Sequence, residues 1–450
     1  MTVHHRYIFT FMAAAALTLL TAKAMDIQEI IGSDGEFFRR CDVDLFLAAG
    51  SPFQRYFRWT SAARDSARYP SGYIQAPTDL NFARIPVREA ICHFQDRELS
   101  RVYLSLYNRG DDGDIPLPEF EALVKRLTDK LTALTRNRGV QKKGNYGRDA
   151  DSHLLLFVTE HLTYSLRWNI TSEGRKKDHR PEFVQLEIMP YNPATDPRSQ
   201  APTAVSKRSL QGKLSLRDNV VRQNNGTVFI DNIPMVDQGQ KGYCSAAVTE
   251  RVLKYFGNDS VTQHTIAQIT NTSALTGTSQ DEMLAAIRKA DTKLGLKMSP
   301  KFELLESFAD LEKIIRRYNT LARKNKLPKI ELASRGGMIN LGALLYSMDS
   351  ETYLASRNQE RQEREKFWRE LKRNIDQGLP LGWGVFVGLV PEPGLLQSAG
   401  GHFRLLIGYN ERNRTVFYSD TWGAGHEKKE MPLEQAWGIT HSLFTYAPKR

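Results

Sequence analysis

Apolar and polar positions in the first half of the chain predict a mixed α+β domain. Runs at Arg101–Tyr107 and Leu154–Thr159 have the apolar, aromatic and β-branched residues of strands, and residues 184–188 alternate between apolar and polar. From Phe120 to Leu134, apolar residues instead recur at helical spacing. We therefore expect a separate N-terminal α+β domain over residues 25–190.

The pattern changes after this domain. From Tyr191 to Gly226, Pro, Asn, Ser, Thr and Gln dominate and apolar periodicity fades, which is typical of a linker. A second domain is predicted over residues 227–450. Its apolar strands come late in the chain, at Leu381–Val390, Phe403–Tyr409 and Arg414–Ser419.

Two helices are predicted in the second domain. Apolar residues at helical spacing follow Cys244, and Gly257 is a plausible C-terminal cap, so Cys244 should begin a buried helix. The segment Ser350–Gln377 is dense in Arg, Glu, Lys and Gln and predicts a solvent-facing helix.

Residues 1–24 are typical of a signal peptide. Arg6 precedes an uncharged apolar run from Ile8 to Leu20, and small residues flank Lys23, so the mature chain should begin near Met25. The alternative is a retained anchor, but this run is shorter than the ~20 residues of a spanning helix. We expect a secreted or periplasmic protein without an integral membrane segment after cleavage.

Length and charge narrow the possible functions. A chain of 450 residues favours two domains, and its net charge of +11 is spread among acidic residues. No nucleic-acid motif is present, so we expect no nucleic-acid partner. The segment Asn108–Glu119 partly fits a calcium loop, but Gly110 replaces a ligand. We therefore expect neither a metal nor a cofactor, and the oligomeric state stays open.

The chain has three cysteines. Cys41 and Cys92 both lie in the N-terminal half, where export would allow them to form a disulfide, although two free thiols are equally compatible with the sequence. Cys244 is the odd cysteine, and an unpaired cysteine in an exported protein is a candidate reactive thiol.

The setting of Cys244 favours nucleophilic chemistry. A helix N-terminus stabilises the thiolate, although a lone cysteine is more often a small buried apolar residue. Gln238 lies six residues earlier, with Gly239 and Gly242 between them to allow a tight turn. Its amide could complete an oxyanion hole with the backbone N–H of Cys244, worth about 3 kcal/mol per donor.

A base and an orienting acid are predicted on the late strands. His402 follows two glycines and begins an apolar strand, whereas His264 and His426 lack such a setting. Asp420 ends the next strand of a predicted hairpin, so its carboxylate could orient His402. Trp422 could shield that hydrogen bond from water.

Together these residues resemble the papain-like cysteine peptidases. Gln238-Gly239-x-x-Gly242-x-Cys244 is similar to the nucleophile motif of that superfamily, and Asp420-Thr421-Trp422 is similar to its Asn-Ser-Trp motif. The acidic third member resembles the bacterial double-glycine leader peptidase branch. The resemblance covers only the C-terminal half and implies a papain-like fold, with a helix carrying Cys packed on an antiparallel sheet carrying His and Asp.

The resemblance also implies the roles of the site residues. Cys244 would be the nucleophile, His402 the base, Asp420 its orienter and Gln238 an oxyanion donor, in a peptidase acting on protein or peptide substrates. Two alternatives stay open, an acyl transferase of transglutaminase or amidase type with the same triad, and an inactive binding module. The N-terminal domain would be either a removable pro-region or a permanent substrate-binding domain.

Overall fold

The structure is a computed structural model. It describes residues 24–69, 80–143, 150–173, 178–193, 216–239, 242–258, 261–270, 285, 294–305, 307–331, 341–397 and 399–448. The predicted signal peptide therefore lies outside the described residues, as does most of the predicted linker. Among the described residues, none of the helices has the length and apolar character needed to cross a bilayer.

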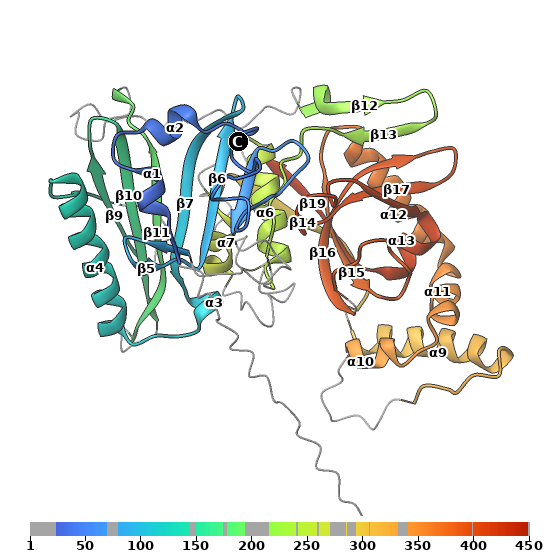
Figure 1. Cartoon of the computed structure of the whole chain (residues 1–450). Helices are drawn as coiled ribbons and strands as arrows, with labels where there is room; N and C mark the ends of the chain where they lie inside the picture. Colours follow the sequence, from blue (N-terminus) through green and yellow to red (C-terminus); the bar gives the residue numbers. More distant parts are fainter. Residues whose placement is uncertain are drawn as a thin grey trace, which may run out of the picture.

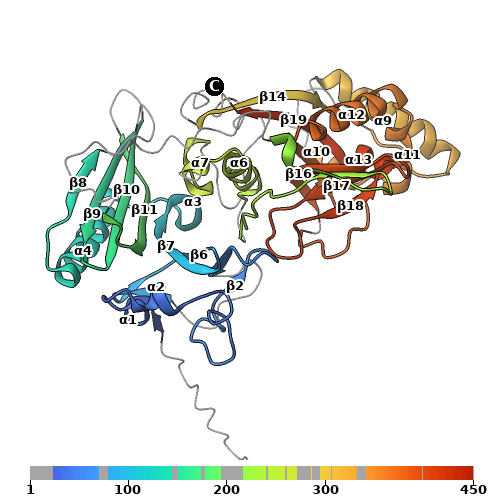
Figure 2. The same cartoon turned by 90° about the horizontal axis from the view of Figure 1, so that it is seen from above.

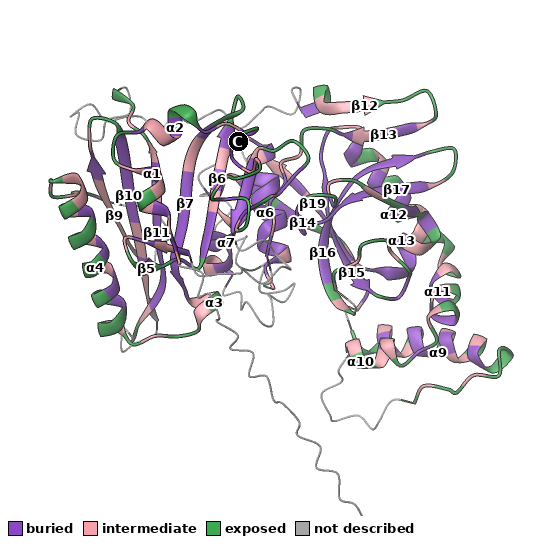
Figure 3. Cartoon of the chain, viewed as in Figure 1, coloured by how far each residue is buried: buried purple, intermediate pink, exposed green. Residues whose placement is uncertain are grey.

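Buried apolar residues form two clusters, one within residues 25–188 and the other within residues 216–446. In Figure 1 the first cluster lies in the blue and green half and the second in the yellow-green to red half. Figure 3 shows that buried residues line the strands of both halves. The last residues of the predicted linker already belong to the second half, because Leu216 is buried there and residues 220–222 join its sheet.

The N-terminal half is built on an antiparallel sheet covered by α4 (Leu117–Thr135). Helix α4 places its apolar stripe, which includes Leu127 and Leu131, in the core, as its helical spacing predicts. In sheet order the strands are β2 (Arg58–Trp59), β3 (Ser66–Tyr69), β6 (Glu89–Gln95), β7 (Glu98–Asn108), β11 (Asp178–Pro190), β10 (Leu162–Glu173), β9 (Ala150–Val158) and β8 (Val140–Lys143). The smaller elements are β1 (Met25–Asp26), α1 (Ile27–Ile31), α2 (Glu36–Arg40), β4 (Leu80–Phe82), β5 (Ile85–Pro86) and α3 (Arg109–Asp112).

The C-terminal half holds a second antiparallel sheet, to which the three late strands predicted from the sequence belong. Its path is β12 (Val220–Arg222), β13 (Thr227–Ile230), β16 (Gly400–Asn410), β15 (Leu381–Val387), β19 (Thr440–Pro448) and β14 (Leu296–Glu303). Strand β17 (Thr415–Ser419) also pairs with β16, and β18 (Lys429–Pro432) pairs with β17. The helices are α6 (Cys244–Tyr255), α7 (Gln263–Ile269), α9 (Phe308–Lys324), α10 (Leu341–Tyr346), α11 (Ser350–Asn358), α12 (Arg361–Ile375) and α13 (Leu433–Ile439), with a 3₁₀ turn at Arg217–Asn219.

Helices α6 and α7 lie between the two sheets in both views (Figures 1 and 2). Helix α6 ends as its sequence predicts. Gly257 adopts φ +88°, its N–H donates to the Lys254 carbonyl, and the N–H of Asn258 donates to the Leu253 carbonyl. These two hydrogen bonds form a Schellman cap, which ends the helix while pairing the carbonyls of its last turn.

The predicted helix at Ser350–Gln377 is wrong as a single element, because the structure divides it into α11 and α12. The break falls at Glu360, whose carboxylate pairs with Arg317 of α9 and Arg357 of α11. This junction contains neither glycine nor proline, so only tertiary contacts mark it. The solvent-facing description is also incomplete, because α12 buries Phe367, Trp368 and Leu371.

Cys41 and Cys92 are free, buried thiols in the structure. Burial, with a smaller contribution from Asp42, raises the pKa of Cys41 to about 12. Burial also raises the pKa of Cys92 far above its ordinary value. Both side chains belong to the N-terminal core, where a small apolar thiol packs well. Their disulfide stays a prediction.

Candidate active site

Cys244 is the first residue of α6, as the sequence predicts. Its side chain is half-buried, whereas Ser245 and Ala246 after it are buried. Helix α6 packs on β16, the strand that carries His402. The fold therefore combines an accessible thiol with the electropositive end of a buried helix, a position that stabilises a thiolate.

His402 and Asp420 meet across the hairpin of β16 and β17. His402 lies near the start of β16, and Asp420 directly follows β17, which pairs antiparallel with β16. The His402 Nε2 atom lies 2.5 Å from Asp420 Oδ1, and both side chains are buried. The Cys244 thiol lies close enough to the His402 ring to contribute to raising the pKa of that ring. With Nε2 directed at Asp420, Nδ1 is the ring nitrogen left to face the sulfur.

Trp422 covers the His402–Asp420 pair. Its ring stacks on that of His402, with centroids 4.4 Å apart and planes 13° from parallel. The His426 ring packs on Trp422 in an edge-to-face arrangement, with centroids 5.5 Å apart. Trp422 thus holds the plane of the His402 ring and covers the charged pair, as its position in the sequence suggests.

A buried arginine that the motifs did not identify holds the second oxygen of Asp420. Arg404 Nε lies 2.8 Å from Asp420 Oδ2, and Arg404 Nη1 lies 2.8 Å from Glu392 Oε2. The Tyr418 hydroxyl donates to the same Glu392 oxygen at 2.6 Å. Arg404 therefore keeps Asp420 ionised and directs its other oxygen at His402. A charged residue inside an apolar run, two positions after His402 and on the same strand face, is the signal that could have revealed it.

Arg251 ties α6, the helix that begins with Cys244, to the strand end at Asp420. This buried side chain donates to the Asp420 carbonyl at 2.7 Å, to Ser419 Oγ at 2.6 Å and to the Pro234 carbonyl at 2.8 Å. One guanidinium therefore joins α6 to the end of the hairpin.

Gln238 is buried beside the same strand end. Its N–H donates to the Thr421 carbonyl at 2.8 Å, and its side-chain Oε1 accepts from the Thr421 hydroxyl. Because Thr421 takes the oxygen of the amide, Nε2 is the donor end, which is what an oxyanion hole requires. Gln240 and Lys241, between Gln238 and Cys244, lie outside the described residues.

The charge state of the pair follows from its surroundings. Burial alone would lower the pKa of His402, but the Asp420 carboxylate and then the Cys244 thiol raise it from 6.5 to about 9. Burial opposes ionisation of Asp420 too, yet His402 and Arg404 hold the pKa of its carboxyl well below the usual range. At neutral pH the site therefore contains an imidazolium beside a carboxylate.

Titration of His402 can be followed directly. By NMR of ring-labelled histidine, assigned with a His402→Gln variant, we expect its titration near pH 9 instead of 6.5. Because folding raises this pKa, the protonated ring stabilises the fold below pH 6.5, and this contribution is lost as the pH rises through about 9. A midpoint at or below 6.5 would contradict the ion-paired geometry.

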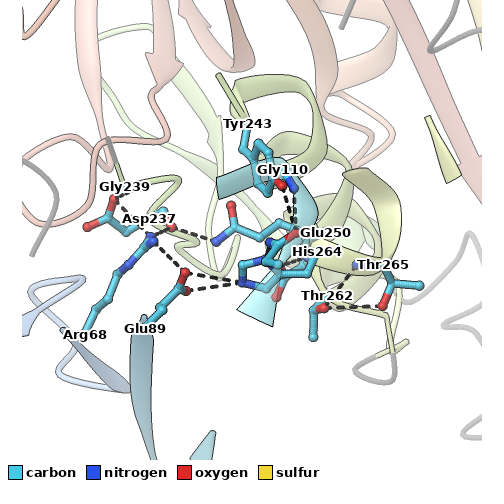
Figure 4. Close-up of polar contacts among 12 residues, drawn as sticks. Arg68, Glu89, Gly110, Asp237, Gly239, Tyr243, Glu250, Thr262, His264 and Thr265 are labelled. Carbon is cyan, nitrogen blue, oxygen red and sulfur yellow. Dashed lines mark hydrogen bonds and ion pairs between the residues drawn. The ribbon is translucent and has the colours of Figure 1, made fainter. Parts of the chain in front are cut away.

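A cluster around a different histidine lies next to Tyr243, the residue before Cys244. His264 of α7, Glu89 of β6 and Asp111 of α3 have potential ligand atoms within 4.8 Å of one another. Arg68 Nη2 lies 3.0 Å from Glu89 Oε2, so this carboxylate already has a cationic partner within the protein. The cluster therefore belongs to a network of ionic contacts between the two halves (Figure 4).

Residues 336–443 match the model of the Peptidase_C39 like family, which belongs to the papain-like cysteine peptidases. The resemblance drawn from the sequence motifs is thereby confirmed for the C-terminal part. The matched range contains His402 and Asp420, whereas Cys244 and Gln238 precede it. The match supports a peptidase on a mixed α+β scaffold. A comparison with curated proteins finds no match.

Proposed function

We propose that this protein is an exported cysteine peptidase that hydrolyses peptide bonds through Cys244, His402 and Asp420 in a papain-like domain. The observation that carries the proposal is the placement of His402. Its ring is paired with Asp420, and the Cys244 thiol at the first turn of α6 is close enough to raise the His402 pKa further. A cysteine that served only for packing would not need a neighbouring histidine that is itself paired with a carboxylate.

The mechanism follows from these contacts. The thiolate of Cys244 attacks the peptide carbonyl carbon, and the oxyanion accepts hydrogen bonds from Gln238 Nε2 and the Cys244 backbone N–H. The C–N bond breaks as His402 gives its proton to the leaving amine, and a thioester remains. His402, now neutral, removes a proton from water, which cleaves the thioester and frees Cys244.

Alkylation tests the activated thiol. At pH 7, limiting iodoacetamide should label Cys244 well before Cys41 or Cys92, whose pKa values are raised by burial. An ordinary thiol is only about 3 % ionised at pH 7, so His402→Gln should slow labelling by up to about 30-fold. Peptide mapping by mass spectrometry after timed quenching measures both effects.

The control is the same reaction in denaturant, where all three cysteines should react alike. Equal labelling of the three in the folded protein, or no effect of His402→Gln, would remove the chemical basis of the proposal. Incubation with a glutamine-containing peptide and a labelled amine identifies the acceptor. We expect hydrolysis products, and incorporation of the amine would indicate the transferase reaction.

Localisation has its own test. Cell fractionation should place the protein outside the cytoplasm, with a mature N-terminus near Met25. Recovery of the full-length chain in the membrane fraction would indicate a retained anchor.

A further inference from the structure

The turn that carries Gln238 is held by the N-terminal half of the chain. Arg68 of β3, whose side chain is buried, donates from Nη1 to the Asp237 carbonyl, and the same nitrogen lies 3.6 Å from Asp237 Oδ1. Figure 4 shows the Arg68 guanidinium reaching Asp237 from a strand of the other half. The residue immediately before the proposed oxyanion donor is thus bound by the other half of the molecule.

Arg68 is itself fixed in place. Glu89 on the neighbouring strand β6 lies 3.0 Å from Arg68 Nη2, and both side chains are buried. Glu89 also lies 3.4 Å from His264 Nε2 on α7, while His264 Nδ1 contacts Asn108 Nδ2 at 2.6 Å. A buried charge with two carboxylate partners has a single favourable position, because displacing it would leave an uncompensated ion.

The turn formed by Asp237, Gln238 and Gly239 is held by hydrogen bonds and by the positive φ of its glycine. Asp237 Oδ1 accepts from the N–H of Gly239 at 2.8 Å, and Gly239 adopts φ +71°. A Cβ atom at Gly239 would collide with the Arg68 guanidinium, so the glycine allows the arginine to approach. Gln263 Nε2 donates to the same Asp237 carbonyl at 2.9 Å. Arg68 thus fixes the residues on both sides of Gln238, while Thr421 fixes Gln238 itself.

The N-terminal half also contacts the residue immediately before Cys244. Tyr243, the residue before Cys244, is buried and packs so closely on Gly110 that a Cβ there would overlap its hydroxyl. Its hydroxyl lies 3.4 Å from Asn108 Oδ1. Groups of the N-terminal half therefore contact the chain both before Gln238 and immediately before Cys244.

We propose that the N-terminal domain is a permanent part of the catalytic unit, in which Arg68 is a positioning residue that holds the Asp237–Gly239 turn so that Gln238 can bind the oxyanion. This inference rests on the proposed peptidase function. It assigns the domain a role in the chemical step, in contrast to a pro-region that must be removed. Residues 25–190 would remain attached to, or associated with, the active enzyme.

The test separates oxyanion binding from thiol activation. Arg68→Met keeps much of the side-chain volume but removes the donors, and should lower kcat by about 10²-fold, the order of losing one oxyanion donor, with KM little changed. Alkylation of Cys244 by iodoacetamide forms no oxyanion, so its rate should stay at the wild-type value. Arg68→Lys should recover part of kcat, because the charge remains.

The matched control is Arg101→Met. Arg101 lies on the same sheet and pairs with Glu187 of that sheet at 3.0 Å, without reaching the Asp237 turn. This variant should keep wild-type kcat. An equal loss in the Arg68 and Arg101 variants, or a joint loss of kcat and alkylation in Arg68→Met, would overturn the inference. A wild type that is alkylated at Cys244 but cleaves no peptide would instead contradict the proposed function.

A second measurement covers the case in which Arg68→Met does not fold. A specific protease site inserted near residue 205 of the full chain allows the two halves to be cut and then separated. We expect the cut protein to stay associated and active, and the separated C-terminal half to lose most of its activity. A rise in activity after removal of the N-terminal half would show a pro-region and overturn the inference.

Discussion

Replacing Cys244 with alanine should abolish peptide-bond cleavage, with a loss of about 10⁴-fold or more. Without the sulfur no thioester forms, and the oxyanion hole has no covalent intermediate to stabilise. Digestion of an unbiased peptide library by the wild type and Cys244→Ala side by side measures the loss. The same experiment maps the bonds that the wild type cuts and separates endopeptidase from exopeptidase action.

Cys41→Ala provides the matched control, because it removes a buried thiol in the other half of the chain. We expect it to cleave the library as the wild type does, with at most a small loss of thermal stability. Cleavage that persists in Cys244→Ala would assign the activity to another group or to a contaminant.

The second large effect is expected at Asp420, where the two functions of the carboxylate can be separated. Asp420→Ala removes both the acceptor for His402 and the charge that raises the His402 pKa, so kcat/KM should fall by about 10³- to 10⁴-fold. Asp420→Asn keeps an oxygen for His402 and for the N–H of Thr421. It should lose less activity at pH 6, while the alkaline limb of its pH profile moves down from about 9 toward 6.5.

Stability must be measured beside activity for these variants, because Asp420 also pairs with Arg404. Leaving a buried arginine without one partner costs about 3 kcal/mol. The double variant Asp420→Ala/Arg404→Met should regain part of that stability but none of the activity. If Asp420→Ala kept wild-type kcat/KM across the pH range, Asp420 would not orient the base.

Local sequence signals were enough to predict the parts of the site that depend on single elements. The helical spacing of apolar residues after Cys244 predicted the helix start, and the apolar strands predicted the hairpin that joins His402 to Asp420. Arg251 and Arg68 could not be found in this way. Each acts on a residue far away in the chain, and an isolated arginine in a sequence is most often a solvated surface group.

The division between α11 and α12 is a second feature that local sequence patterns did not predict. Nothing near Glu360 disfavours a helix, so the pattern predicts one continuous element. Of the two arginines that pair with Glu360, Arg357 is local, whereas Arg317 can stabilise the break only after α9 has packed. Charges brought together by the fold thus decided both the helix boundary and the support of the active site.

The pairing of β13 with β16 bears on when activity can arise during synthesis. Thr227 pairs with Asn410, so the strand that precedes the nucleophile waits for a partner from nearly the opposite end of the domain. A nascent chain that has emerged as far as α6 carries the thiol but neither His402 nor Asp420. Such late, long-range pairing is slow to form. Under the proposed mechanism, a newly made chain therefore has no peptidase activity until its last strands are in place, and a prematurely terminated chain never acquires it.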